Sequence, residues 1–218
     1  MDFDNIKRKL EQYQAEGKQV FTSSSFQTHS IVLLHILSRI DRSIPVYFIN
    51  TGFHFPETLM FRDEISDRLG LNLIDLKTPV SKSQQLDQDN QFFYSSDPDY
   101  CCFLNKTAPM QSVLKEYDVW INGVRGDQSA VRKAMQVEQP APHNSLRFHP
   151  MLDWNAKSIY QYRKEFDLPE HPLDAQGYMS IGCAPCTRKL DPEMQEREAR
   201  WYGMNKTECG LHTDLIKK

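Results

Sequence analysis

The stretch PVYFINTGFHFPETLMFRDEISDRLGLNLIDL, residues 45–76, decides the fold class. Residues 46–50 are apolar and β-prone, and residues 71–76 form a second run of this kind. Between them, Pro56 and Glu57 are typical of the first turn of a helix, because proline fits the first helical position and a carboxylate stabilises the positive helix end. A strand, a helix and a strand with short connections predict a right-handed crossover in a parallel sheet.

A similar unit lies upstream in KQVFTSSSFQTHSIVLLHILSRI, residues 18–40. It predicts a strand at 19–22, a polar loop of Ser23, Ser24 and Ser25, and a helix from about 29 to 40. Backbone N–H groups, the positive helix end and the serine hydroxyls suit an anion such as a phosphate. The loop lacks the Gly-Lys-Ser/Thr of a Walker motif, and a serine loop can also serve only as a helix cap. Ligands of parallel sheets bind beyond the carboxyl ends of the strands, so this loop and residues 50–52 are predicted to share one pocket.

The rest of the chain fits the same architecture. An apolar run at residues 118–122 predicts another buried strand, and the polar residues 78–100 predict a surface excursion. Helical periodicity recurs at residues 2–15, 107–117 and 155–166. The predicted fold class is therefore α/β, with a mostly parallel twisted sheet flanked by helices.

Composition narrows the class of partner. The 218 residues carry 26 Lys and Arg against 29 Asp and Glu, a net charge of −3, which gives no global attraction for nucleic acid or anionic membranes. No apolar run approaches the roughly 20 residues that span a bilayer. The odd number of five cysteines and the charged N-terminal segment favour reduced thiols and a cytoplasmic location. The oligomeric state stays open, and a homo-oligomer is one of the options.

Four of the cysteines form two close pairs. Cys183 and Cys186 have a spacing that lets two thiolates reach one metal centre, and Cys101 and Cys102 are adjacent. Adjacent cysteines suit a single tetrahedral zinc poorly, whereas in an iron–sulfur cluster each thiolate binds a different iron. The spacing therefore favours a cluster over zinc, and buried cysteines without a metal remain a third interpretation.

The fifth cysteine, Cys209, lies in ECGLH, residues 208–212. A cysteine is nucleophilic only as a thiolate. The neighbouring Glu208 would disfavour ionisation, while His212 or a nearby basic cluster would favour it. A cysteine that no metal site needs is a candidate nucleophile.

The motifs, taken in order, resemble those of the assimilatory sulfonucleotide reductases, the adenylylsulfate (APS) and phosphoadenylylsulfate (PAPS) reductases of sulfate assimilation and cysteine biosynthesis. The resemblance runs from about residue 20 onward. It rests on TSSSF (22–26), INTGFHFPET (49–58), CCFLNK (101–106), GVRGDQS (123–129), HPMLDW (149–154), GYMSIGCAPCTR (177–188) and ECGLH (208–212).

The resemblance implies an adenine nucleotide alpha hydrolase-like fold with a 4Fe-4S cluster. Residues 1–202 would form the sulfonucleotide-binding domain, and residues 203–218 a mobile tail that carries the catalytic Cys209. The metal ligands implied are Cys101, Cys102, Cys183 and Cys186. Cys209 would attack the sulfate sulfur of APS and form an S-sulfocysteine, and thioredoxin or a similar dithiol would then release sulfite.

The resemblance also implies the substrate contacts. These are Ser23, Ser24, Ser25, Lys106, Arg125, Arg197 and Arg200. Cations near the transferred sulfate stabilise the added negative charge of an attacking thiolate, and arginine forks suit its oxygens. The three-residue spacing of Arg197 and Arg200 predicts that they share one helical face. For Arg125, Arg132 and Lys133, which follow the strand at 118–122, solvated surface charge is the alternative interpretation.

Two features depart from the cluster-bearing members. Asn105-Lys106 stands where Arg-Lys is common, and SSSF in the first loop resembles the PAPS-using branch. The cysteine pairs favour APS, and PAPS is the alternative substrate. An ATP-pyrophosphatase-type adenylating enzyme is a further alternative, but its Ser-Gly-Gly-x-Asp-Ser motif is missing. The acidic balance argues against a zinc module that binds nucleic acid.

Overall fold

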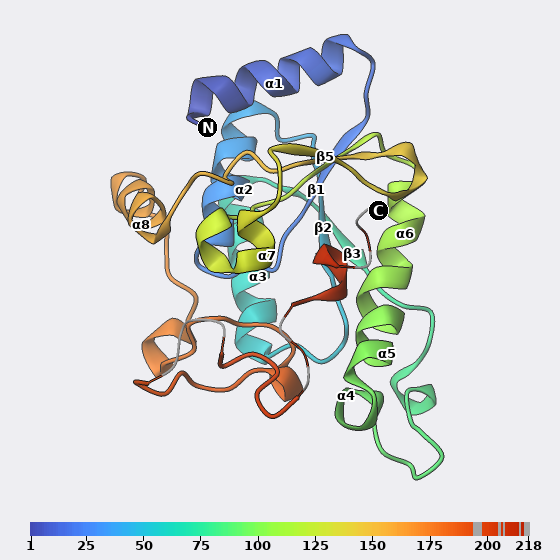
Figure 1. Cartoon of the computed structure of the whole chain (residues 1–218). Coiled ribbons are helices and arrows are strands. Elements are labelled where there is room, and N and C mark those ends of the chain that lie inside the picture. The colour runs from blue at the N-terminus through green and yellow to red at the C-terminus, as the bar shows by residue number, and fades with distance from the viewer. Residues whose placement is uncertain (194–197, 205, 207, 214, 216–218) are drawn as a thin grey trace.

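The computed structural model describes residues 1–193, 198–204, 206, 208–213 and 215 (Figure 1). Within these residues six strands form one sheet in the order β3-β2-β1-β4-β6-β5. The strands are β1 (Val20–Ser23), β2 (Pro45–Ile49), β3 (Asn72–Leu76), β4 (Val119–Ile121), β5 (Glu138–Pro140) and β6 (Leu146–Phe148). All neighbouring pairs are parallel except β5 with β6. The predicted mostly parallel sheet is confirmed.

Helices cover both faces of the sheet (Figure 1). One face is covered by α1 (Phe3–Ala15), α2 (Ser30–Ile40), α3 (Pro56–Leu69) and α8 (Ala156–Glu165). The other is covered by α6 (Ala108–Leu114). Short helices are α4 (Phe93–Ser96), α5 (Pro98–Cys102) and α7 (Ala130–Lys133). The 3-10 turns are Lys82–Gln84, Gly126–Gln128, Pro142–Asn144, Asp174–Gln176, Ala184–Cys186 and Gly210–His212.

Alternating side chains divide the core into two clusters. Val46 and Phe48 of β2 pack with the α2 side, whereas Tyr47 between them packs with the α6 side. This is the period of two that a strand imposes when both its faces are buried. Each large apolar side chain removed from water contributes about 1.5–3 kcal/mol. Leu215 is fully buried in the α6-side cluster, so this part of the tail packs onto the sheet.

The segment after residue 78 differs from its prediction. The surface excursion contains α4 and α5, and α5 continues through a π-helical turn, Phe103–Thr107, into α6. The predicted helix at 107–117 therefore begins earlier and ends at Leu114. π-helical turns are rare in proteins, but many of those that occur lie at functional sites, because the extra residue changes the direction of the side chains around it.

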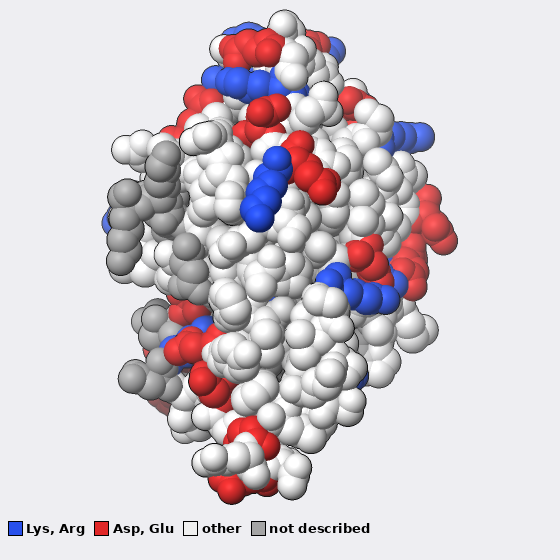
Figure 2. All heavy atoms as spheres, turned by 90° about the vertical axis from the view of Figure 1, so that its right-hand side faces the viewer, with Lys and Arg blue, Asp and Glu red and all other residues white. Residues whose placement is uncertain are grey.

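The strand order reverses between β1 and β4, which opens a crevice at the carboxyl ends of these strands. No helix in the described part of the chain is both long and apolar enough to cross a membrane. On the face that Figure 2 shows, the side chains of Lys or Arg and those of Asp or Glu are interspersed.

Candidate functional site

A cavity of about 190 Å³ lies at this crevice. The ends of β1, β2 and β4 contribute to its wall, as does the start of α2. The side chains from the predicted site that line it are Ser23, Ser24, Ser25, Lys106, Arg200 and Cys209. The predicted pocket of the serine loop therefore exists, but from the β2 end it takes Ile49 and His54 instead of residues 50–52.

The serine loop is held by its own hydrogen bonds. Trp120 Nε1 donates to Ser23 Oγ (2.8 Å), and the Phe26 N–H donates to Ser24 Oγ (3.1 Å). Ser25 Oγ lies 3.2 Å from Ser30 Oγ, at the first residue of α2. Phe26 takes a left-handed φ of 53° and is fully buried, so the loop turns sharply into the helix. The loop therefore faces the cavity together with the positive end of α2, which suits a phosphate.

The four paired cysteines line a second, smaller cavity. Cys101 and Cys102 lie at the end of α5, while Cys183 precedes the turn Ala184–Cys186 and Cys186 is its last residue. All four are buried and none forms a disulfide. Among the described residues no three His, Cys, Asp or Glu side chains lie close enough to hold one metal ion. Four sulfurs around one cavity fit the donor set of a multi-iron cluster.

Burial changes the pKa values of three of these cysteines. Burial, together with the neighbouring cysteines, raises the pKa of Cys101 to about 12. Burial also raises the pKa values of Cys102 and Cys186. Without a bound cation these thiols stay protonated near neutral pH, and metal ligation would have to supply the positive charge that ionises them.

Asn105 supports the cysteine pair at the π-helical turn. It is 1% exposed, its Nδ2 donates to Gln85 Oε1 (2.6 Å) and to the Cys101 carbonyl (3.0 Å), and Gln85 Nε2 donates back to Asn105 Oδ1 (3.1 Å). Asn105, which stands where the resemblance would put an arginine, is therefore a buried amide that pairs with the Gln85 amide.

Lys106 lines both cavities. Burial lowers its pKa, but electrostatic interactions with Cys183, Cys102 and Cys209 outweigh burial, so the net effect raises the pKa of Lys106. Lys106 therefore stays charged between the two groups of cysteines.

Arg200 forms a β-bridge with Thr187 and lies over the Trp201 ring, with its Cζ 4.5 Å from the ring centroid. The prediction that it uses a helical face is wrong, because residues 198–204 are not helical; Arg197 lies outside the described residues. The Arg200 guanidinium also packs against Gly182, where an added Cβ would come within 2.2 Å of Nη2. Its Nε is buried without a hydrogen-bond partner in the described part of the protein. This cation therefore has donor capacity for a ligand in the cavity.

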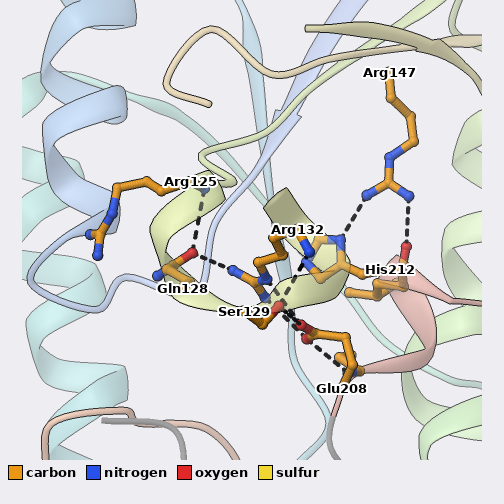
Figure 3. Close-up of polar contacts among 9 residues, drawn as sticks. Arg125, Gln128, Ser129, Arg132, Arg147, Glu208 and His212 are labelled. Carbon is orange, nitrogen blue, oxygen red and sulfur yellow. Dashed lines mark hydrogen bonds and ion pairs between the residues drawn. The ribbon is translucent and has the colours of Figure 1, made fainter. Parts of the chain in front are cut away.

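Arg125 and Arg132 follow β4 but lie differently. Arg125 is 3% exposed, its Nε donates to Asp127 Oδ1 (2.9 Å), and it does not line the cavity. Figure 3 shows it pointing away from the tail residues, and its role as a substrate contact stays a prediction. Arg132 is 8% exposed and lines the cavity. The solvated-charge interpretation is wrong for Arg125 and Arg132, which are buried, whereas Lys133 is exposed.

The ECGLH segment is attached to the body by two arginines (Figure 3). Arg132 forms a forked ion pair with Glu208, with Nε–Oε2 at 3.0 Å and Nη2–Oε1 at 3.1 Å. Arg147, fully buried in β6, donates to the Leu211 carbonyl (3.1 Å) and to His212 Nδ1 (2.7 Å). These contacts place Cys209 at the wall of the main cavity.

Sequence reasoning missed His54 and Arg147. Burial lowers the pKa of His54 to about 4, so its imidazole is neutral, and its Nε2–H donates to the Ile49 carbonyl (2.9 Å). His54 lies in the INTGFHFPET motif without a signal of its own. Arg147 lies outside the quoted motifs, and the residues that it contacts are more than 60 positions away.

The fold and the site together define an α/β protein of the nucleotide-binding type, with a thiol, a serine loop and the cations Lys106 and Arg200 around one cavity. The family model for the phosphoadenosine phosphosulfate reductase domain matches residues 19–189. The chain belongs to this family, the sulfonucleotide reductases.

Known relatives carry both substrate names. A Chelativorans sp. (strain BNC1) protein named adenosine 5'-phosphosulfate reductase is 36% identical over 208 residues, which cover 95% of this chain and 84% of the relative. A Gloeobacter violaceus protein named phosphoadenosine 5'-phosphosulfate reductase is 36% identical over 200 residues, with 90% and 83% covered. A solved structure, the phosphate complex of PAPS reductase from Candida auris, matches with a TM-score of 0.69 and 22% identity over 82% of this chain and 87% of that chain. This last likeness concerns the fold alone.

Proposed function

We propose that the protein reduces APS to sulfite and AMP in sulfate assimilation, with thioredoxin or a similar dithiol as reductant. One observation carries the proposal: Cys209 shares a cavity with the serine loop, Lys106 and Arg200. A nucleophile, a phosphate cradle and sulfate-binding cations are the parts that thiolate attack on a sulfonucleotide requires.

In the first step the Cys209 thiolate attacks the sulfate sulfur. A bond forms between the Cys209 sulfur and that sulfur, the bond from sulfur to the phosphate oxygen breaks, and AMP leaves with the electron pair. The product is an S-sulfocysteine. In the second step a thiolate of the dithiol attacks the Cys209 sulfur, and sulfite leaves with the electrons of the S–S bond. The second thiol of the reductant then frees Cys209, so the dithiol supplies two electrons and ends as a disulfide.

Each charged group of the cavity has a task in this scheme. The serine loop and the positive end of α2 hold the phosphate, as in other helix-terminus anion sites. Lys106 and Arg200 face the sulfate and stabilise the charge that the thiolate adds. Arg200 has a free Nε donor among the described contacts, which suits a fork-like contact with sulfate oxygens.

We further propose that Cys101, Cys102, Cys183 and Cys186 hold a 4Fe-4S cluster. The support is the convergence of four buried, unpaired sulfurs on one cavity that Lys106 also lines. When bound, the cluster would supply the iron that keeps these four cysteines as thiolates, and it would give structural support beside Lys106. The attack, the leaving of AMP and the release of sulfite are carried by this chain's side chains and the dithiol.

PAPS is the second candidate substrate. The SSSF loop supports it, because the extra serine hydroxyls add donors for a further phosphate, and relatives bearing either name are equally similar. The two cysteine pairs support APS. The free thiols are consistent with a reducing, cytoplasmic setting, and residues 203–218 are proposed as the part that moves when substrate enters.

The deciding experiment measures sulfite formation from APS and from PAPS with reduced thioredoxin. Turnover is expected with APS, and faster turnover with PAPS would reassign the substrate. Cys209→Ser should abolish sulfite release while AMP binding stays intact. Absence of turnover with both nucleotides, or substantial turnover by the serine variant, would refute the proposal.

A further inference from the structure

Glu208, the residue before the nucleophile, is buried in an ion pair. It is 6% exposed, and its partner Arg132 is 8% exposed. Both carboxylate oxygens meet a guanidinium nitrogen, at 3.0 and 3.1 Å. The Cys209 backbone N–H also donates to Glu208 Oε1 (3.0 Å). One carboxylate therefore ties the backbone of the nucleophile to the segment that follows β4.

Arg132 is itself fixed to the body of the protein. Gln128 accepts a hydrogen bond from Arg132 Nη1, and Ser129 Oγ accepts from the Arg132 N–H (3.2 Å) at the start of α7. Ser129 Oγ also lies 3.5 Å from Glu208 Oε2. Upstream, Asp127 accepts from the Ala156 N–H (3.1 Å) and so attaches this segment to α8. The anchor for Cys209 is a hydrogen-bonded part of the fold (Figure 3).

The ion pair also controls charge at the nucleophile. An unpaired Glu208 next to Cys209 would oppose both the thiolate and an approaching anion. Arg132 neutralises this carboxylate in a buried setting, where removing one partner leaves an uncompensated charge. Because Arg132 is paired with Glu208, Lys106 and Arg200 are the cations of the cavity that we assign to the substrate.

We propose that Arg132 is a positioning residue for Cys209. It acts through Glu208, holds the thiol at the wall of the main cavity and masks the neighbouring carboxylate. The assignment rests on the proposed function for its kinetic consequence, but the placement of the tail is independent of turnover. A residue of this kind affects the chemical step more than nucleotide binding, since the phosphate is held by the serine loop.

The test compares Arg132→Gln with Lys133→Gln, which removes an exposed charge from the neighbouring position. Two readouts need no turnover: protease cleavage between residues 200 and 210, and the rate at which iodoacetamide labels Cys209, read by peptide mass. The third readout is the split between kcat and KM. Arg132→Gln is expected to lower kcat roughly 100-fold, to change the AMP dissociation constant less than about threefold, and to expose the tail to protease. Lys133→Gln should behave like the parent protein.

A charge exchange guards against a folding artefact. The double variant Arg132→Glu with Glu208→Arg should have the protease protection of the parent protein and at least about one tenth of its kcat. Each of the two single variants should lose both properties. Unchanged tail cleavage and unchanged kcat in Arg132→Gln would overturn the proposal. It would also be overturned if that variant raised the KM for APS and left tail protection intact, because Arg132 would then contact substrate directly. If the parent protein reduced neither nucleotide, the proposed function would be refuted. The cleavage and labelling data would still test whether Arg132 holds Cys209 in place.

Discussion

Gly182→Ala should impair substrate binding without unfolding the protein. An ideal Cβ at this position would lie 2.2 Å from Arg200 Nη2, 2.4 Å from Cζ and 2.7 Å from Nη1. Carbon and nitrogen atoms in ordinary contact lie about 3.5 Å apart, so the guanidinium must move by about 1 Å. The clash is with the end of a flexible side chain, so the fold can accommodate it. The backbone at Gly182 lies outside the left-handed region, so alanine introduces no strain there.

The magnitude follows from what Arg200 contributes. Hydrogen bonds to charged groups are worth about 1.5–3 kcal/mol, and 1.36 kcal/mol corresponds to a factor of ten. Displacing the guanidinium should therefore raise the KM for APS roughly 10- to 150-fold. Replacing glycine by alanine also restricts the unfolded chain, which favours the folded state by about 0.4–1 kcal/mol. The melting temperature should consequently stay within a few degrees of the parent value.

Steady-state sulfite formation and thermal unfolding measure the two quantities. The matched control is Arg200→Ala, in which the added methyl group has no guanidinium to displace. Gly182→Ala should have no further effect on KM in that background. An unchanged KM in the single variant, or an equal loss in both backgrounds, would contradict the reasoning.

Two other outcomes are expected. Cys183→Ser should lose bound iron and thermal stability together in anaerobically purified protein, and unchanged iron content would remove Cys183 from the ligand set. The free energy of unfolding should fall on acidification, because burial lowers the pKa of His149 from 6.5 to about 4. Above pH 6.5 both states hold a neutral ring, and between pH 6.5 and 4 only the unfolded state takes up the proton. His149 alone should therefore remove about 2 kcal/mol between pH 7 and 5, and His149→Gln in urea titrations should flatten this dependence.

The elements that could be predicted from sequence are those with a repeated pattern. The units at residues 18–40 and 45–76 are long enough for strand and helix periods to be distinct, and their observed ends lie within one or two residues of the prediction. Strands β5 (EQP) and β6 (LRF) were missed because each has three residues with polar or charged side chains among them, whereas the equally short β4 (VWI) is wholly apolar. Pro140 in β5 is tolerated because β5 is an edge strand.

The residues of the candidate site were likewise predicted from the sequence only in part. Ser23, Lys106 and Cys209 could be named because each lies in a motif, and the structure brings all three to one cavity. The partnership of Arg132 with Glu208 joins residues 76 positions apart and has no local signature. The spacing of Arg197 and Arg200 suggested a helix, but the β-bridge to Thr187 determines the backbone at Arg200. Tertiary contacts override a short spacing of this kind.

The position of Lys106 links the two groups of cysteines. It follows Cys101 and Cys102 within one π-helical turn, and it lines both the cysteine cavity and the substrate cavity. Burial alone would lower its pKa, and electrostatic interactions with Cys183, Cys102 and Cys209 more than offset that effect. The paired cysteines would therefore favour the charged form of Lys106 in the proposed chemistry, even though none of the four reacts in it. This coupling gives a physical reason for placing four buried cysteines beside the cavity that Cys209 lines.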